Sequence, residues 1–288
     1  MAQFIHLDPN HPHALNDVLA PYRNLTDASL RALEAQGQLG RFIAEGPLVV
    51  REALLRTRDE ASAGRPGVVQ SILVDAAALD AHRELLTLAP ADLPVYVAPR
   101  ELIQNIVGFQ FHRGILAYGV RPNDRDWRTL ARDASALIVL ENLSNHDNVG
   151  SIFRSVAALA GPSAAVLLTP GCCDPLYRKS LRVSIGQALR IRFARVEPWP
   201  QALSDLAEMG FAPIALTPNP GAPHIAQVAT SRSGRPMLLI GAEGPGLDDA
   251  TLHHPAVTGA RIPMAPGVDS LNAGVAAAVA MSHLMRPE

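Results

Sequence analysis

The stretch Arg261–Leu284, which reads RIPMAPGVDSLNAGVAAAVAMSHL, determines the predicted fold class. A short apolar strand ends at Pro263, a polar loop follows, and the chain then enters a helix of almost only alanine, glycine and valine. Because small side chains let another backbone approach closely, we expect this helix to be tightly buried. Ser270 and Asn272 precede it, and both types cap helices while keeping side-chain groups for a ligand. The pattern predicts a binding site at the start of this helix.

Upstream of this stretch, strand-like and helix-like segments alternate from residue 136 onward. The segment Ala136–Leu140 is a run of apolar residues, as expected for a strand buried on both faces. Further strands are expected over 164–168, 191–196, 211–216 and 237–241, and helices over 149–160, 175–184 and 199–209. This alternation favours an α/β fold with a mostly parallel sheet.

A polar, charged segment, Arg121–Arg128, precedes this region, and we interpret it as a linker. Before it we expect strands over 41–45, 68–75, 95–98 and 114–120, helices over 48–57, 77–86 and 100–106, and two short leading helices over 15–22 and 28–36. The sequence therefore predicts two domains, a smaller α/β domain over residues 1–121 and a larger one over 129–288.

The composition is that of a soluble globular protein, with 48% hydrophobic and 18% charged residues in a chain of 288. A net charge of -2 gives no general attraction to nucleic acid or membranes, so any polyanion site must be local. The adjacent Cys172 and Cys173 favour neither a disulfide nor a zinc site, and we expect no bound metal. Because the sequence shows no secretion signal and no run that could span a membrane, we expect a cytoplasmic protein.

The first segment with chemistry in it, Glu141–Arg154, directly follows the strand 136–140. It lies at the carboxyl edge of the sheet, where parallel α/β proteins bind ligands. We expect Asn148 to cap the next helix, and Arg154 to reach past Gly150 to the loop, where a guanidinium can bind a phosphate or a carboxylate. An ordinary cap and a surface arginine explain the same spacing equally well.

The second segment, Gly241–Leu247, reads GAEGPGL and follows a buried strand. Its glycines permit positive φ angles and a close approach of backbone to a ligand, and Glu243 is its only charged residue. It is not the GxGxxG pattern of dinucleotide sites, which needs a helix directly behind it. A tight turn with a solvated glutamate is the alternative. The third segment is the loop 264–272 before the alanine-rich helix.

Basic residues gather between Asp174 and Glu197, with no acidic residue among them. Such a cluster suits a phosphate backbone, although a solvated surface is about as common an explanation. The basic residues are Arg178, Lys179, Arg182, Arg190, Arg192 and Arg195.

Taken together and in this order, the three segments resemble the three motifs of the SpoU/TrmH family of RNA 2'-O-methyltransferases, in the SPOUT superfamily. Each motif alone is weak, but three in register are specific, and they cover residues 136–285. The matching positions are Asn148-x-Gly150-x-x-x-Arg154, Gly241-x-Glu243-Gly244-x-Gly246-Leu247, and Ile262-Pro263-Met264 with Ser270-Leu271-Asn272. One departure is visible: the family usually continues with Val-Ser, whereas this chain has Ala273-Gly274 and lacks a hydroxyl at position 274.

The resemblance implies a deep trefoil knot in the C-terminal domain, bound S-adenosylmethionine, and a homodimer that shares its active site. It places the catalytic group at Asn148, Arg154, Glu243, Ser270 and Asn272. It places the cofactor contacts at Leu216 or Thr217, Gly241, Ile262, Leu271 and Ala273. Because a guanidinium is almost never neutral, we expect Arg154 to bind phosphate and polarise the hydroxyl, oriented by Asn148, rather than to act as a free base.

Residues 1–121 are similar, more loosely, to the ribosomal-protein-like RNA-binding domain of many such enzymes, through Phe42–Gly46 and His112–Ala117. The expected RNA-binding residues are Arg113, Arg178, Lys179 and Arg182. The resemblance implies methylation of a ribose 2'-hydroxyl in structured RNA, with rRNA favoured over tRNA by analogy. The alternatives are a tRNA enzyme and a non-catalytic RNA-binding protein that keeps the fold. A class I methyltransferase is disfavoured, because no glycine-rich loop follows the strand 136–140.

Overall fold

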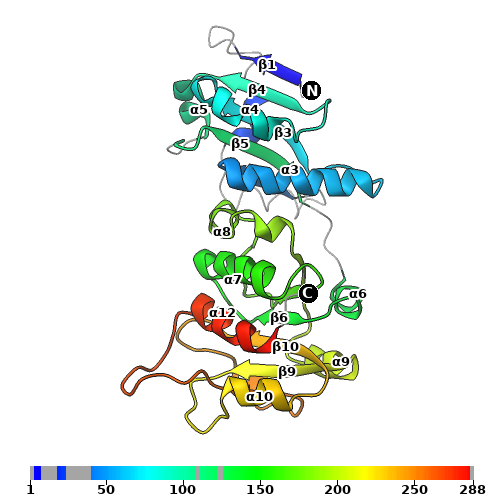
Figure 1. Cartoon of the computed structure of the whole chain (residues 1–288), viewed down its shortest axis with the longest axis vertical. Helices are drawn as coiled ribbons and strands as arrows, with labels where there is room; N and C mark the ends of the chain where they lie inside the picture. The colour runs from blue at the N-terminus through cyan, green and yellow to red at the C-terminus, as the bar shows by residue number, and fades with distance from the viewer. Residues whose placement is uncertain (1–2, 8–17, 24–39, 108–110, 122–125, 286–288) are drawn as a thin grey trace. The chain divides into compact units, whose positions relative to one another are not determined.

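The computed structural model describes residues 3–7, 18–23, 40–107, 111–121 and 126–285. The chain forms two compact units (Figure 1). The first unit contains Met1–Asn123 and Leu176–Leu189, and the second contains Asp124–Pro175 and Arg190–Glu288. The segment Leu176–Leu189 thus groups with the first unit, although it lies inside the predicted larger domain. The expected helix 28–36, the first three residues of the expected helix 15–22 and residues 122–125 of the expected linker lie outside the described residues.

The first unit is built on a five-stranded mixed sheet in the order β1-β4-β3-β5-β2. The strands are β1 (Gln3–His6), β2 (Arg41–Glu45), β3 (Val69–Asp75), β4 (Pro94–Ala98) and β5 (Ile115–Val120). The last four follow the predicted apolar runs, and their side chains are mostly buried. The edge strand β1 was not predicted, because it is short and mostly exposed.

The helices of the first unit are α3 (Pro47–Ser62), α4 (Arg83–Leu86), α5 (Arg100–Val107) and α8 (Arg178–Val183). The helix expected over 77–86 is broken into 3-10 turns, Ala76–Ala78 and Asp80–His82, followed by the single α-helical turn α4. The first of these turns begins where the Asp75 side chain accepts a hydrogen bond from the Ala77 amide. Single 3-10 turns also cover Ala20–Tyr22 and Gln187–Leu189.

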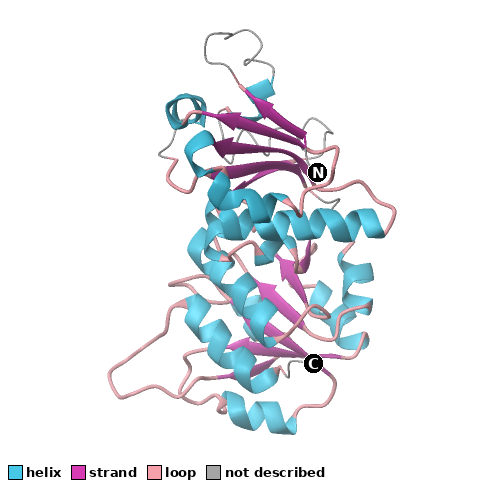
Figure 2. Cartoon of the chain, turned by 45° about the horizontal axis from the view of Figure 1, so that its top comes forward, coloured by secondary structure: helices cyan, strands magenta, loops and turns pink. Residues whose placement is uncertain are grey.

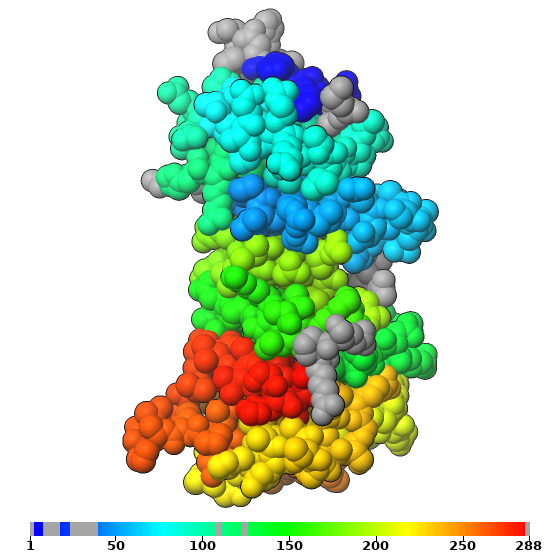
Figure 3. All heavy atoms as spheres, in the orientation of Figure 1, coloured from blue at the N-terminus to red at the C-terminus, as the bar shows by residue number. Residues whose placement is uncertain are grey.

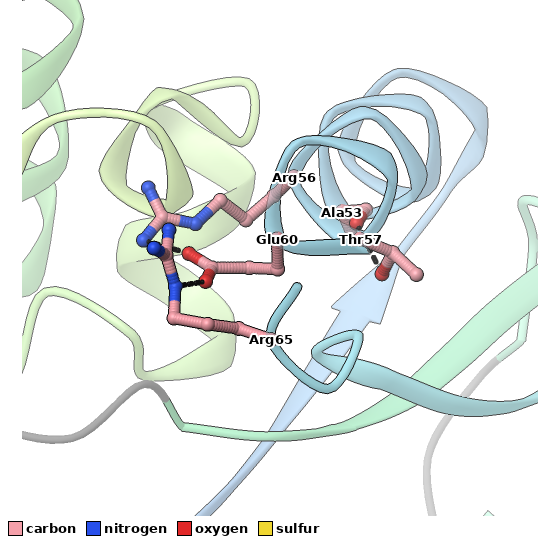
Figure 4. Close-up of polar contacts among 5 residues, drawn as sticks. All are labelled: Ala53, Arg56, Thr57, Glu60 and Arg65. Carbon is pink, nitrogen blue, oxygen red and sulfur yellow. Dashed lines mark hydrogen bonds and ion pairs between the residues drawn. The ribbon is translucent and has the colours of Figure 1, made fainter. Parts of the chain in front are cut away.

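Helix α3 runs one turn beyond its predicted end, and charge pairing stabilises that turn (Figure 4). The Glu60 carboxylate is 2.5 Å from the Arg56 guanidinium and also accepts a hydrogen bond from Arg65 Nε. Burial raises the pKa of Glu60, but the hydrogen bond from Arg65 and the charge of Arg56 outweigh it and hold the pKa below the usual 4.5. The carboxylate is therefore stabilised in its charged form.

The substitution Glu60→Gln is expected to lower the free energy of unfolding by about 1 kcal/mol at neutral pH. Because the folded-state pKa is depressed, this contribution is present above the unfolded value of 4.5 and is lost as the pH falls through the folded value. Urea denaturation of both proteins at pH 7 and pH 3 checks this. As a control, Asp80→Asn removes an ion pair whose side chains are 89% and 70% exposed, and we expect no change. An equal deficit for Glu60→Gln at both pH values would contradict the assignment.

The second unit is built on a six-stranded sheet in the order β11-β9-β10-β6-β7-β8. All of its strand pairs are parallel, which confirms the predicted α/β class with a mostly parallel sheet. The strands are β6 (Leu137–Leu140), β7 (Ala165–Leu168), β8 (Arg192–Arg195), β9 (Phe211–Leu216), β10 (Arg235–Ile240) and β11 (Thr258–Ala260). We had predicted that the last strand ends at Pro263. Strand β11 instead ends at Ala260, and Arg261 extends the strand pairing only by an isolated parallel β-bridge to His224.

Helices cover both faces of this sheet (Figure 2). They are α6 (Trp127–Arg132), α7 (His146–Leu159), α9 (Ala202–Glu208), α10 (Ile225–Ser231), α11 (Asp249–Leu252) and α12 (Ala273–Leu284). Residues of α6 and α9 form one core cluster with alternate side chains of β6 and β10, including Leu137, Val139 and Leu239. Helix α6 begins inside the expected linker, because Asp126 caps it and Trp127 is buried. No helix among the described residues is long and apolar enough to cross a membrane.

The alanine-rich helix α12 lies beside α7 (Figure 1), and one face of it is buried as predicted, whereas Val275, Ser282 and His283 are exposed. Ala277 and Ala280 are fully buried. A Cβ atom added to Gly274 would be 2.2 Å from Ser151 Oγ on α7. Glycine at position 274 therefore fits the close contact of these two helices, and a larger residue would require the Ser151 hydroxyl to move.

Candidate functional site

A cavity of about 420 Å³ opens beyond the carboxyl ends of β9 and β10. Its walls come from the loops that follow β9, β10 and β11 and from the first turns of α12. All six positions expected to contact a cofactor line it: Leu216, Thr217, Gly241, Ile262, Leu271 and Ala273. Three of the expected catalytic residues, Glu243, Ser270 and Asn272, line the same cavity. Segments far apart in the sequence thus meet where the parallel strands end.

One wall of the cavity is the turn that follows β10. Ala242 and Gly246 exchange two backbone hydrogen bonds of 3.0 Å, so the turn folds back on itself. A Cβ atom added to Gly241 would be 2.1 Å from the Gly246 carbonyl carbon and 2.2 Å from the Leu247 nitrogen. Position 241 therefore needs glycine, and this wall is formed by closely packed backbone.

Glu141, which the sequence did not assign to the site, holds the end of this turn in place. Its carboxylate is buried, with 1% of the residue exposed. It accepts hydrogen bonds of 2.6 Å from the Asp248 amide, the Trp199 indole and the Thr251 hydroxyl. Three donors meet the requirement of a buried carboxylate for hydrogen bonds. The sequence signal that could have identified Glu141 is its position as a charged residue directly after the apolar strand β6.

Asn272 is hydrogen-bonded to two other expected catalytic residues, Asn148 and Glu243. Its Oδ1 atom accepts from the Gly274 and Val275 amides, at 3.0 and 3.3 Å, and so caps α12. Its Nδ2 atom donates to Asn148 Oδ1 at 2.9 Å and to Glu243 Oε1 at 3.0 Å. This arrangement links the start of α12, the first turn of α7 and the turn after β10.

The prediction that Asn148 caps α7 is wrong. The helix begins at His146, and the cap is Asn145, whose Oδ1 accepts from the Asp147 amide at 2.9 Å. The pattern offered two asparagines three residues apart, and the earlier one defines the helix start. Asn148 lies inside the first turn, is 3% exposed, and turns its carbonyl to Asn272. Among the described residues, its Nδ2 has no hydrogen-bond partner.

Arg154 is not among the residues that line the cavity of its own chain. It lies two turns along α7, its side chain is exposed, and within the described part of the chain it makes no hydrogen bond or ion pair. The expected contact with Asn148 is not formed in the single chain. Ser270 lines the cavity and is also exposed.

The four residues expected to bind RNA all belong to the first unit, three of them on α8. Arg178 forms a 2.8 Å ion pair with Glu45, which is 4% exposed, and Arg182 is 4.0 Å from the same carboxylate. Arg113 is exposed and packs against Gly46. Glu45 thus neutralises part of the positive charge of α8.

The remaining basic residues of the predicted cluster lie in the second unit, so the cluster is divided between the units. Arg192 donates to the Ser163 carbonyl at 2.6 Å. Arg195 donates to the Thr169, Pro170 and Cys172 carbonyls at 3.3 to 3.5 Å. These two arginines bind backbone of their own unit.

Across the residues that the structure describes, neither Cys172 nor Cys173 forms a disulfide bond. Cys172 is buried and donates to the Leu140 carbonyl at 3.0 Å, and this burial raises the pKa of the thiol. Among the described residues, no three His, Cys, Asp or Glu side chains come together in a way that suits a metal ion.

Comparison with known proteins gives a family and a fold. The model of the SpoU rRNA Methylase family matches residues 135–282. An uncharacterized tRNA/rRNA methyltransferase of Mycobacterium tuberculosis is 40% identical over 200 residues, which cover 69% of this chain and 68% of that protein.

Two solved structures share the fold. The AdoMet-bound rRNA methyltransferase of Sinorhizobium meliloti has a TM-score of 0.71 at 20% identity, and the match covers 97% of each chain. The SpoU methyltransferase AviRb of Streptomyces viridochromogenes, in complex with AdoMet, has a TM-score of 0.71 at 23% identity, covering 93% of this chain and 97% of the other.

Proposed function

This chain belongs to the SpoU rRNA Methylase family, and we propose that it transfers a methyl group from S-adenosylmethionine to a ribose 2'-hydroxyl of structured RNA. We favour rRNA over tRNA as the substrate and the cytoplasm as the location. The observation that carries the proposal is the cavity at the carboxyl ends of β9 and β10 in the second unit. Six expected cofactor positions and three expected catalytic residues lie around it.

The cavity fits S-adenosylmethionine in size and in chemistry. Its volume of about 420 Å³ lies within the range of small-molecule sites. The close-packed turn at Gly241 presents backbone groups to a ligand, and Glu243 supplies a carboxylate beside them, which suits a ligand that carries positive charge. The bound cofactor supplies an electrophilic methyl group. Two structures with this fold are described as AdoMet-bound.

The residues of the chain are proposed to align the acceptor hydroxyl. Arg154 binds a phosphate of the RNA and polarises the 2'-hydroxyl, while Asn272, Glu243 and Ser270 hold the acceptor at the cavity mouth. Alignment of this kind can contribute up to ~7–11 kcal/mol to lowering the barrier. Asn148 does not contact Arg154 in the single chain. We therefore propose a different role for Asn148, which is to hold Asn272 in place by accepting a hydrogen bond from its side-chain amide.

We propose that a second copy of the chain completes the site. Three large apolar side chains in this part of the chain are exposed, Val268 at 49%, Leu271 at 38% and Val275 at 50%, and Leu271 lines the cavity. They lie on the loop 264–272, which stands out from the second unit in orange (Figure 3), and on the first turn of α12. Exposed apolar patches mark interaction sites. In the proposed homodimer the partner covers this patch and brings its own arginine from α7 to the cavity, and the chain around the cavity forms a trefoil knot.

The first unit is proposed to bind the RNA. Arg113, Lys179 and Arg182 contact phosphates, whereas Arg178 mainly fixes α8 through its ion pair with the buried Glu45. Contacts to phosphates position RNA without reading its sequence. We therefore propose residues 1–121, together with α8, as the substrate-binding domain and the second unit as the methyltransferase domain.

Methyl transfer with purified protein tests the proposed function. The chain is incubated with S-adenosylmethionine carrying a labelled methyl group and with rRNA or tRNA from cells that lack the gene. We expect label in rRNA, recovered after digestion as a 2'-O-methylated nucleoside. Label in a methylated base would contradict the ribose assignment, and label in tRNA alone would contradict the preferred substrate. Cofactor binding without transfer to any RNA would favour the non-catalytic alternative.

A further inference from the structure

Two helices of the second unit begin with an asparagine cap, and both caps contact the same carboxylate. Asn145 caps α7 and donates from Nδ2 to Glu243 Oε2 at 3.4 Å. Asn272 caps α12 and donates from Nδ2 to Glu243 Oε1 at 3.0 Å. Each carboxylate oxygen of Glu243 therefore receives one amide hydrogen bond.

The capping interactions fix the direction of both amides. In each asparagine, Oδ1 accepts from backbone N–H groups at the helix start, at 2.9 Å for Asn145 and 3.0 Å for Asn272. A flipped amide would place its NH₂ group against a backbone donor and its carbonyl against a carboxylate, which would lose hydrogen bonds at both ends. Only the donating NH₂ groups can therefore face Glu243.

The two caps are also held in place relative to each other. Helices α7 and α12 pack so closely that a Cβ at Gly274 would be 2.2 Å from Ser151 Oγ. A site built on packed helices positions its side chains more precisely than one built on loops. Glu243 itself lies in an exposed turn, so the fixed caps give it the orientation that its own turn does not.

We infer that Asn145 is a positioning residue for Glu243, and that the pair of capping amides holds this carboxylate at the cavity mouth. We call the two hydrogen bonds from Asn145 and Asn272 to Glu243 the clamp. The importance of Glu243 for the reaction rests on the proposed function, but the existence of the clamp does not. Asn145 lies in the first segment but is not one of the positions that match the family motifs. It precedes the motif asparagine Asn148 by three residues.

Capping and clamping can be separated, because aspartate caps a helix about as well as asparagine but cannot donate. Asn145→Asp keeps the cap of α7 and places a second carboxylate against Glu243. We expect the melting temperature to fall by about 2–4 °C. Adding Glu243→Gln supplies an amide that can donate to the new carboxylate, and we expect the double variant to recover the loss. The control is Asp126→Asn at the cap of α6, for which no change is expected.

Activity provides a second readout. Asn145→Asp is expected to lower kcat at least about 10-fold with unchanged affinity for RNA, and the double variant is expected to recover melting temperature but not kcat. If Asn145→Asp melts like the wild type, or if Glu243→Gln does not relieve its loss, the clamp is overturned. If the wild type transfers no methyl group, the proposed function fails while the melting cycle still tests the clamp. Thus the two failures are distinguishable.

Discussion

Arg154→Lys is expected to lower kcat by about 100-fold or more, while the melting temperature and the affinity for S-adenosylmethionine stay at wild-type values. The fold is expected to be unaffected, because the exposed Arg154 side chain makes no hydrogen bond or ion pair within the described residues of its chain. The loss follows from geometry, since a planar guanidinium binds phosphate through two parallel hydrogen bonds and an ammonium does not. Single-turnover methyl transfer to rRNA measures the effect.

The matched control for this substitution is Arg132→Lys, which changes an exposed arginine on α6 of the same unit. We expect it to leave kcat unchanged. Near-full turnover of Arg154→Lys would contradict the proposed role of the guanidinium.

Mixed dimers test whether Arg154 acts on the cavity of the partner. Arg154→Ala protein is combined with Glu243→Ala protein, each inactive alone. Activity in the mixture is expected, because one of the two sites then has both side chains intact. No recovery would place Arg154 and Glu243 of the same chain in one site.

Gly241→Ala is expected to weaken S-adenosylmethionine binding by at least about 100-fold and to lower the free energy of unfolding by about 1–3 kcal/mol. The added Cβ would be 2.1 and 2.2 Å from backbone atoms of Gly246 and Leu247, so no side chain can move aside to relieve the clash. The turn after β10 must open, and the wall of the cavity is lost. Calorimetric titration with S-adenosylmethionine and urea denaturation measure the two effects.

The control for this position is Gly221→Ala in the loop after β9. Among the described residues, the one neighbour within 4 Å of an added Cβ there is the end of the exposed Asn219 side chain, at 3.3 Å. We expect its affinity and stability to match the wild type. Wild-type affinity in Gly241→Ala would show that the turn does not contact the cofactor.

The sequence predicted those features that depend on local pattern. Apart from β1 and β11, the strands of both sheets lie where the sequence predicted strands, and the tight packing of α12 follows from its small residues. The family motifs placed Gly241, Glu243 and Asn272 at one cavity, because the carboxyl ends of parallel strands meet at one edge of the sheet.

Features that depend on tertiary contacts were not predictable. Nothing in the local pattern distinguishes Asn145 from Asn148 as the cap of α7, since asparagine is a good capping residue at either position. Which of the two becomes the cap depends on where the helix starts, and α7 starts at His146. Similarly, α8 is a short basic helix within the sequence of the predicted larger domain, and its grouping with the first unit depends on tertiary contacts such as the ion pair of Arg178 with Glu45.

The most direct measurement for the central claim is a crystal structure of the chain with S-adenosylmethionine. The account predicts density for the cofactor in the cavity of the second unit, against Gly241, Ile262 and Leu271, with an α7 arginine from one of two associated chains near Glu243 and Asn272. Cofactor bound elsewhere, or a cavity mouth that no Arg154 reaches from either chain, would contradict it.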